Sequence, residues 1–330
     1  MPKYHVYGVG NALVDMEFEV SEDTLASLGV DKGLMTLIEE DRHHALLAEL
    51  NVSEARQGSG GSAANTVIAS AQLGANAFYS CKVADDHTGT FYMNDLNEAG
   101  VDSNLTPSNR EPGLTGKCIV LITPDAERSM NTFLGITQRI SQRELDEAAI
   151  KESDIVYIEG YLVPEPDARA AAIKTREVAE AAGVQTALTL SDVNMVKFFK
   201  DGMNDMIGQG VDLLFCNEEE ALLMTESGDI SAAVPALQKI SKRFAVTLGA
   251  KGALLFDGQN TIEIPAESVT PVDSNGAGDI YAGTFLYGLT HGMSFGDCGK
   301  MAGAAATELV QHFGARLPSE SLQAIGKKFS

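Results

Sequence analysis

The hydrophobic and polar positions of this chain alternate between short apolar runs typical of strands and stripes typical of amphipathic helices. Residues 4–20 begin with an apolar run, turn at glycines and then alternate, which predicts two strands. Residues 60–75 open on two glycines and carry apolar side chains at helical spacing, which predicts a helix that ends at Gly74. By the same reasoning we expect a strand that runs into a polar turn over 77–86, a strand over 154–162, and a strand that ends in polar residues over 185–192. We expect helices over 87–101 and 165–183, a strand and a helix over 211–225, two strands joined by a glycine turn over 243–258, and two small-residue helices after residue 272.

Strands that alternate with helices predict an α/β fold with a mostly parallel sheet covered by helices on both faces. Residues 116–135 depart from this alternation, because two extended segments flank PDAE with no helix between them, which predicts a hairpin. This hairpin and the strands expected within 12–41 predict a small β-layer separate from the main sheet. We see no composition break, so we expect a single domain over 1–330, with the small layer within 12–41 and 114–135.

Charge and cysteine usage narrow the class of protein. The net charge of −22 repels polyanions, so we expect no nucleic-acid partner. The chain has no basic start followed by an apolar stretch and no apolar run near 18 residues, so we expect neither a signal peptide nor a membrane span. None of the four cysteines forms a CxxC pair, which favours buried, reduced thiols in a cytoplasmic protein. These cysteines are Cys81, Cys118, Cys216 and Cys298.

Polar clusters follow the predicted strands along the chain. Ligands of parallel sheets bind beyond the carboxyl ends of the strands, so these clusters are expected to form one site. The clusters are GGSAAN at 60–65, LSD at 190–192, NEEE at 217–220, TLGAKG at 247–252 and DSNGAGD at 273–279.

The glycines of DSNGAGD stand between a strand region and a helix. The first N–H groups of a helix lack internal partners and carry the positive end of its dipole, so this position favours an anion. Asp279 falls in the first helical turn, where it could accept a hydroxyl proton while the backbone holds a phosphoryl group. An Asp279 that only complements the helix dipole fits the spacing equally well.

Two common nucleotide-binding motifs do not account for this chain. The P-loop pattern is absent. GSGGSA at 58–63 fits a dinucleotide loop, but residues 50–57 before it are a poor strand. A nicotinamide-dependent oxidoreductase is therefore disfavoured.

DSNGAGD resembles the D-T-x-G-A-G-D signature of the ribokinase/PfkB family of carbohydrate and nucleoside kinases, with Ser274 in place of threonine. GGSAAN is similar to the first signature of that family, NEEE to its N-x-x-E motif and TLGAKG to its T-x-G-x-x-G segment. The four matches occur in the family's order over nearly the whole chain. They imply a ribokinase-like fold with a small β-sheet lid, and an ATP-dependent kinase that uses Mg²⁺ and takes an alcohol group as acceptor.

Residues 7–20 resemble the opening of adenosine kinases, where G-N-P-L-L-D is typical, with Ala12 in place of proline. Residues 33–40 and 127–135 are similar to those of bacterial adenosine or sugar kinases. Adenosine is therefore the first candidate acceptor, and a fructose or ribose kinase is the alternative. A non-catalytic nucleotide-binding or sugar-binding protein is an interpretation of another class. Within this family the lid is either a cover or an interface, so both a monomer and a lid-mediated homodimer are expected forms.

The resemblance also implies catalytic and substrate-binding residues. Asp279 would be the general base that takes the proton from the primary hydroxyl. The anion hole would consist of Gly276, Ala277 and Gly278. The sugar hydroxyls would be bound by Asn11, Asp15, Gly60, Gly61 and Asn65. Arg128 on the hairpin would reach phosphate or substrate, although an arginine there is also typical of a solvated surface.

The remaining implied residues concern the nucleotide and cations. Asn217 and Glu220 would organise Mg²⁺ and the ATP phosphates, with Mg²⁺ contacted through water. The nucleotide groove would be lined by Thr247, Gly249 and Gly252. Asp273 would bind or neighbour K⁺ together with carbonyls of the segment 308–316. Asp192 also stands at a strand end, where the sequence does not separate a functional role from a structural one.

Overall fold

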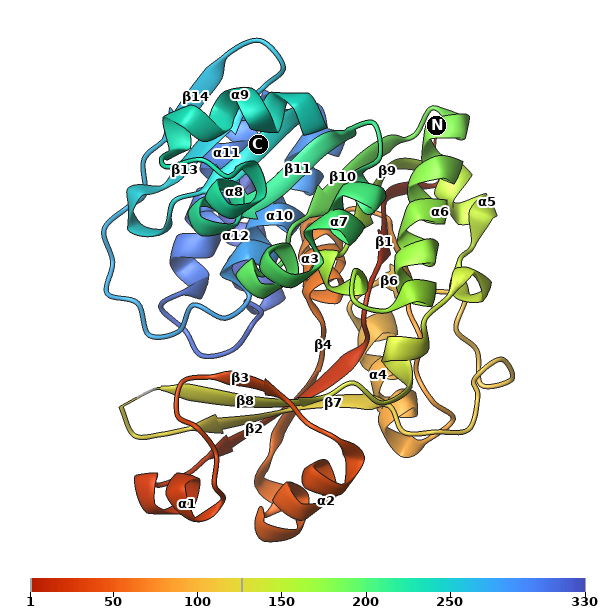
Figure 1. Ribbon diagram of the computed structural model, residues 1–330, viewed down its shortest axis with the longest axis vertical. Coiled ribbons are helices and arrows are strands. Elements are labelled where there is room, and N and C mark those ends of the chain that lie inside the picture. Colours follow the sequence, from red (N-terminus) through yellow and green to blue (C-terminus); the bar gives the residue numbers. More distant parts are fainter. Residues whose placement is uncertain (1, 126, 330) are drawn as a thin grey trace.

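The computed structural model describes residues 2–125 and 127–329, which form two β-sheets flanked by helices (Figure 1). The larger sheet has nine strands within these residues, parallel except for the last two strands at one edge. In spatial order the strands are β14 (Thr261–Ile264), β13 (Ala253–Phe256), β12 (Ser241–Thr247), β11 (Val211–Asn217), β10 (Gln185–Thr189), β9 (Ser153–Ile158), β1 (Tyr4–Val9), β5 (Ala77–Ser80) and β6 (Val101–Asp102).

Helices cover both faces of this sheet, because neighbouring residues of each strand point to opposite faces. Ile155 and Tyr157 of β9 belong to one apolar core, and Val156 and Ile158 belong to the other. The first core is closed by α3 (Ser62–Leu73), α4 (His87–Glu98), α10 (Ala277–Thr290) and α11 (Phe295–Leu309), against which α12 (Ser319–Lys328) packs. The second core is closed by α5 (Glu147–Lys151), α6 (Pro166–Ala182), α7 (Val193–Ile207), α8 (Glu218–Thr225) and α9 (Ile230–Ile240).

The smaller sheet lies beside one end of the larger sheet, with two helices on its far side (Figure 1). Its central strands β7 and β8 form an antiparallel hairpin, and β2 runs parallel to β7. In spatial order its strands are β3 (Met35–Leu37), β8 (Arg128–Phe133), β7 (Gly116–Ile122), β2 (Leu13–Glu19) and β4 (Arg56–Gly60), and the two helices are α1 (Glu22–Ser27) and α2 (Glu40–Glu49).

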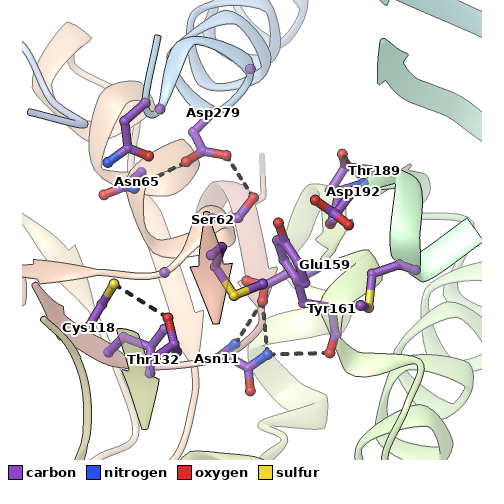
Figure 2. Close-up of a pocket in the computed structure, with 18 of the residues that line it drawn as sticks. Asn11, Ser62, Asn65, Cys118, Thr132, Glu159, Tyr161, Thr189, Asp192 and Asp279 are labelled. Carbon is purple, nitrogen blue, oxygen red and sulfur yellow. Dashed lines mark hydrogen bonds between the residues drawn. The ribbon is translucent and has the colours of Figure 1, made fainter. Parts of the chain in front are cut away.

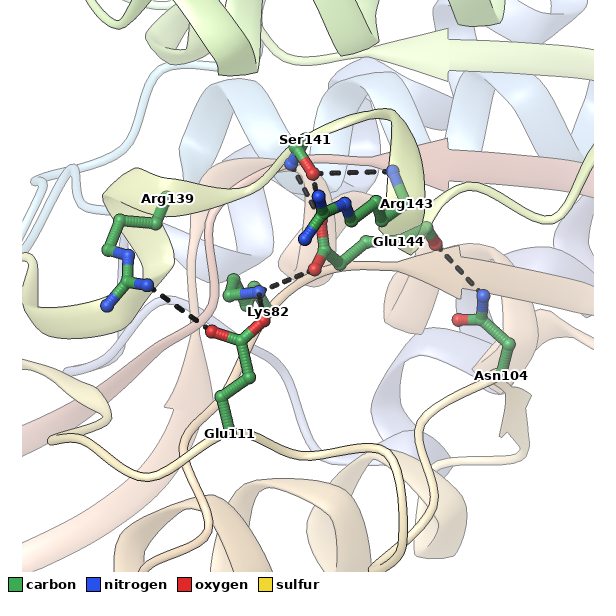
Figure 3. A network of polar contacts seen from close by, with 7 residues as sticks. All are labelled: Lys82, Asn104, Glu111, Arg139, Ser141, Arg143 and Glu144. Atoms are coloured by element: carbon green, nitrogen blue, oxygen red, sulfur yellow. Dashed lines mark hydrogen bonds and ion pairs between the residues drawn. The ribbon is translucent and has the colours of Figure 1, made fainter.

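An ion-pair network centred on the buried Lys82 connects three loops (Figure 3). Lys82 follows β5, and its side chain is only 8% exposed. Its Nζ donates to Glu111 Oε1 at 2.9 Å and to Glu144 Oε1 at 2.6 Å. Glu144 also accepts the N–H of Ser141, so the loop after β8 is tied to the end of β5.

The α/β fold with a smaller second sheet confirms the fold expected from the sequence. Residues 50–57, expected to be a poor strand, contain a short 3-10 helix at Val52–Glu54, but β4 begins at Arg56, so a strand does lead into the paired glycines. β5 ends at Ser80 and residues 81–86 leave the sheet as a loop, which agrees with the strand and polar turn expected over 77–86. No helix in residues 2–125 and 127–329 is long and apolar enough to cross a membrane.

Candidate active site

A cavity of about 520 Å³ lies between the carboxyl ends of the large sheet and the small sheet. Four of the parallel strands, β1, β9, β10 and β11, each end at polar residues that line it. The strand-end residues are Asn11, Glu159, Thr189, Asp192 and Asn217. The opposite wall comes from the small sheet and is mainly apolar, with Leu13, Met35, Leu37, Val120, Met130 and Leu134.

The N-terminus of α10 opens onto this cavity. Gly276 is the residue before the helix and has a φ of 72°, which favours glycine, and a Cβ there would collide with the carbonyl oxygen of Ala315. At Gly278 an added Cβ would meet no described atom within 4 Å, so the space beside this residue is open. No described side chain caps the helix. The N–H of Ala277 donates to the carbonyl oxygen of Ser274 at 3.3 Å, whereas Gly278 and Asp279 have no N–H partner among the described residues, which leaves these groups available to an anion.

Asp279 is held in the first turn of α10 by two donors from the first turn of α3 (Figure 2). Ser62 Oγ donates to its Oδ1 at 2.7 Å, and Asn65 Nδ2 donates to its Oδ2 at 3.1 Å. Burial raises the pKa of Asp279 to about 6, although both hydrogen bonds favour the ionised form. Asp279 is therefore a carboxylate at neutral pH that remains basic enough to accept a proton.

Glu159 is a buried carboxylate that orders the neighbouring part of the site. Its Oε1 accepts the side-chain N–H of Asn11 at 3.0 Å, and its Oε2 accepts the backbone N–H of Ala63 at 2.9 Å. Glu159 also requires a glycine at position 10, because a Cβ on Gly10 would collide with Glu159 Oε2. Burial raises the pKa of Glu159 to about 7, and the negative charge of Asp279 contributes to this rise. The hydrogen bonds from Ala63 and Asn11 lower the pKa, because they stabilise the charged carboxylate.

Asp15 projects from β2 into the cavity. Its carboxylate accepts no hydrogen bond from the residues that the structure describes, so its oxygens are available to substrate hydroxyls. Burial raises the pKa of Asp15 to about 7, with Arg316 lowering it and Glu17 raising it. Gly60 leaves room for this carboxylate, because a Cβ there would lie within 2.6 Å of Asp15 Cγ.

Gly61 links the small sheet to α3 and also lines the cavity. Its φ of 103° is in the region that favours glycine, and a Cβ would collide with the carbonyl oxygen of Asn11. The paired glycines 60–61 therefore allow Asp15, Asn11 and the start of α3 to approach one another closely.

Asn217 and Glu220 cap α8 reciprocally where β11 ends at the cavity. Asn217 Oδ1 accepts the backbone N–H of Glu220 at 2.8 Å, and Glu220 Oε2 accepts the backbone N–H of Asn217 at 3.0 Å. Glu220 is 4% exposed, and burial raises its pKa to about 7. The backbone hydrogen bond from Asn217 lowers this pKa, whereas the negative charges of Asp192 and Glu219 raise it further. The residues described include no cluster of three or more His, Cys, Asp or Glu that could hold a metal ion by itself.

Several of the predicted site residues lie together around the cavity, and others lie apart from it. Those that line it are Asn11, Asp15, Gly61, Asn65, Asn217, Glu220, Thr247, Gly276, Ala277, Gly278 and Asp279. Those that do not are Gly60, Arg128, Gly249, Gly252 and Asp273. Gly249 and Gly252 form the turn after β12, and Arg128 lies 2.9 Å from Asp273 in an ion pair.

Sequence reasoning did not find Glu159, Ser62 or Tyr161, which also line the cavity. The signal for Glu159 was a lone carboxylate directly after the apolar run of β9, a position where parallel sheets place ligand-binding groups. Ser62 lies inside the GGSAAN motif, so its position beside the paired glycines was a signal for a site residue. Asp192, which the sequence left undecided, lines the cavity and caps α7 by accepting the N–H of Asn194 at 2.7 Å.

Comparisons with known proteins agree with this geometry. The chain matches the model of the pfkB family carbohydrate kinases over residues 29–322. It is 34% identical to an adenosine kinase from Sinorhizobium meliloti, whose structure superposes with a TM-score of 0.89 over 99% of this chain and 100% of that one. A probable sugar kinase from Rhizobium etli is 33% identical, with a TM-score of 0.90 over 99% of both chains.

A curated relative, the adenosine kinase of Saccharomyces cerevisiae, is 28% identical over 95% of this chain and 97% of its own length. The expected family and type of enzyme are thereby confirmed. The chain belongs to the pfkB family of carbohydrate kinases and is an ATP-dependent kinase with a hydroxyl group as acceptor.

Proposed function

We propose that this kinase phosphorylates the primary hydroxyl of a nucleoside, with adenosine as the first candidate, and that Asp279 is its general base. The observation that carries the proposal is the position of Asp279, held by two hydrogen bonds in the first turn of α10, whose N-terminus has no side-chain cap among the described residues. A base and an anion-binding helix end are the two groups that transfer of a phosphoryl group to a hydroxyl requires.

In the proposed reaction the acceptor oxygen forms a bond to the γ-phosphorus of ATP, and the bond from that phosphorus to the β–γ bridging oxygen breaks. The hydroxyl proton moves to the carboxylate of Asp279, and ADP leaves with the bridging oxygen. A pKa of about 6 suits this proton transfer at neutral pH, because the group is ionised but not too weak a base. The N–H groups at Gly276–Gly278 stabilise the charge on the transferred phosphoryl oxygens.

The two walls of the cavity suit the two halves of a nucleoside. Asp15 has unpaired oxygens for ribose hydroxyls, and Asn11 is oriented beside it by Glu159. The apolar wall of the small sheet, with Met35 and Leu37, is suited to the flat face of a base. A free ribose or fructose would leave this wall uncovered.

The nucleotide end suits a cation that arrives with ATP. Glu220 and Asp192 are two neighbouring acids, and the buried Glu220 has a raised pKa, so a positive charge here would be favourable. Glu220 would contact Mg²⁺ through water, because both of its oxygens already accept hydrogen bonds from Asn217. When bound, Mg²⁺ neutralises charge on the ATP phosphates.

A panel of acceptors tests the substrate. Adenosine, inosine, guanosine, ribose and fructose are each supplied with ATP, and ADP formation is measured. We expect turnover with nucleosides, adenosine above the others. Turnover of the sugars alone would favour the second candidate, a sugar kinase, which the similarity to the Rhizobium etli protein supports.

The same assay tests the base. Asp279→Asn is expected to lower turnover by roughly 10²–10⁴-fold while ATP binding persists. Asp297→Asn is the matched control, because Asp297 occupies the first turn of α11, is exposed and lies outside the cavity. Equal effects of the two substitutions would mean that Asp279 only complements its helix dipole.

A further inference from the structure

Arg128 makes a buried ion pair between the small sheet and the loop before α10. It is the first residue of β8, and its side chain is 7% exposed. Its Nη1 donates to Glu17 Oε1 at 3.0 Å. Its Nη2 lies 2.9 Å from Asp273 Oδ2, which is an ion pair by distance although the N–H group is not aligned as a hydrogen bond. Arg128 therefore connects the small sheet to the segment that leads into the anion-binding glycines.

Both oxygens of Asp273 have backbone partners as well. Oδ1 accepts the N–H of Asn275 at 3.0 Å, and Oδ2 accepts the N–H of Gly314 at 2.9 Å. The side chain of Asp273 is 5% exposed. Since the guanidinium of Arg128 lies against the same Oδ2, the carboxylate of Asp273 is surrounded by two backbone N–H groups and one positive charge.

The segment after α11 completes the environment of the guanidinium. The ring of Phe313 faces Arg128, with 5.7 Å between the guanidinium carbon and the ring centroid, which is a cation–π contact. In the same segment the carbonyl oxygen of Val310 accepts two backbone N–H groups, from Val272 at 2.7 Å and from Asp273 at 3.1 Å.

The resemblance to ribokinase-like enzymes assigns K⁺ to Asp273 and to carbonyls of these segments, and the residues present do not fit that ion. The oxygens of Asp273 face N–H groups and a guanidinium. The carbonyl oxygen of Val310 already accepts two backbone N–H groups. A second positive charge at this carboxylate would be repelled by Arg128, more strongly because the site is buried.

We propose that Arg128 itself supplies the positive charge that Asp273 requires, so that the loop entering the anion hole is ordered by the small sheet and not by a monovalent cation. Arg128 is thus a positioning residue, which acts on Gly276–Gly278 through Asp273. The proposal rests on kinase activity but not on the identity of the acceptor.

The experiment compares turnover in KCl, NaCl and tetramethylammonium chloride at one ionic strength, with any acceptor that the enzyme phosphorylates. We expect equal rates for the natural chain in the three salts. Arg128→Met is expected to lower kcat between about 10- and 100-fold, with smaller changes in the KM values, because the anion hole is displaced while the binding walls remain. Arg128→Lys, which keeps the charge, should recover part of this loss.

Arg56→Met is the matched control, because Arg56 also projects from the small sheet and pairs with Glu19 but is exposed. It should behave like the natural chain. Stimulation of the natural chain by K⁺ over tetramethylammonium, or equal behaviour of Arg128→Met and Arg56→Met, would overturn the proposal.

A second readout requires no acceptor and no activity. A cation that binds the folded protein raises its melting temperature, so we expect the same Tm for the natural chain in the three salts. A Tm that rises with KCl alone would overturn the proposal even if no acceptor were turned over, and it would leave the nucleoside assignment untouched. The Tm of Arg128→Met in the same series shows whether a loss of kcat reflects unfolding.

Discussion

At the scale of single residues, four acidic side chains around the cavity have a raised pKa because burial disfavours their charged forms. Asp15, Glu159 and Glu220 have values of about 7, and Asp279 has a value of about 6. Two side-chain donors stabilise the ionised carboxylate of Asp279 and oppose the effect of its burial. Of the four groups, Asp279 is the one in the first turn of α10.

The pH dependence of turnover should reveal this group. Asp279 acts as a base only when ionised, so kcat/KM is expected to rise with pH up to about 6 and then to level off. Ser62→Ala removes a donor to the carboxylate and should move this limb to higher pH, because the charged form loses a hydrogen bond.

Ser294→Ala is the control, since Ser294 donates to an aspartate outside the cavity at the start of α11. An acid limb near the ordinary aspartate pKa of about 4, or an equal shift in both variants, would contradict the assignment of the limb to Asp279.

The positions of Asp279 and of the capping pair Asn217–Glu220 could be predicted, because short motifs place them at helix starts. The buried position of Glu159 could not be predicted, because it depends on contacts with Gly10 and with the N–H of Ala63, which are far from Glu159 in the sequence. The same holds for Arg128, whose partner Asp273 is brought to it only by the packing of the two sheets.

At the scale of elements, the start of α10 combines two glycines with different requirements. Gly276 has a positive φ and packs against the carbonyl oxygen of Ala315. Gly278 is already helical, and open space surrounds the position of a Cβ. The first glycine is therefore required by the fold, and the second leaves room for whatever binds at the helix end.

Alanine substitutions should separate these two requirements. Gly276→Ala is expected to lower the free energy of unfolding by at least about 1–2 kcal/mol, because alanine would be held in the left-handed region. Gly278→Ala should leave stability unchanged or slightly higher, since alanine favours helix, but should lower turnover by about tenfold or more by filling the phosphoryl position.

Chemical denaturation and ADP formation measure the two effects, with Gly303→Ala on α11 as a control that is not in the cavity. A stable, fully active Gly278→Ala variant would contradict an anion hole at this position.

Several elements did not follow from the sequence pattern. α9 contains Pro235, which is atypical of a helix interior, and α7 has a non-helical residue at Phe199 that interrupts its apolar period. The edge strand β14 has only four residues; Ile262 and Ile264 face the core, but so short an alternation is a weak signal for a strand. The long amphipathic helix α6 and the buried strands were predictable because their burial follows one regular period.

At the scale of the whole molecule, the small sheet forms one wall of the cavity, while α3 and α10, which carry Asp279 and its two donors, pack on the large sheet. The two parts meet at Gly61, at the ion pair of Arg128 and through Arg316, which donates to Ser59 on β4. This arrangement suits a lid that closes over the acceptor and excludes water from the phosphoryl transfer.

Hydrogen exchange with and without acceptor measures this closure. Amides of the β7–β8 hairpin are expected to gain protection when the acceptor binds, because the hairpin forms the wall against it. The β12–β13 hairpin of the large sheet is an internal control and should change little. Equal changes in both hairpins, or none in either, would count against a lid.

The cluster of buried acids also has a consequence for the stability of the fold. A carboxyl group whose pKa is higher in the folded than in the unfolded chain binds more protons when folded, so the free energy of unfolding falls as the pH rises from about 4 to about 7. These carboxyl groups therefore make the fold less stable near neutrality than at pH 4. A substrate that brings hydroxyl donors or a cation to them is expected to relieve this cost, so its binding should raise the melting temperature most near neutral pH.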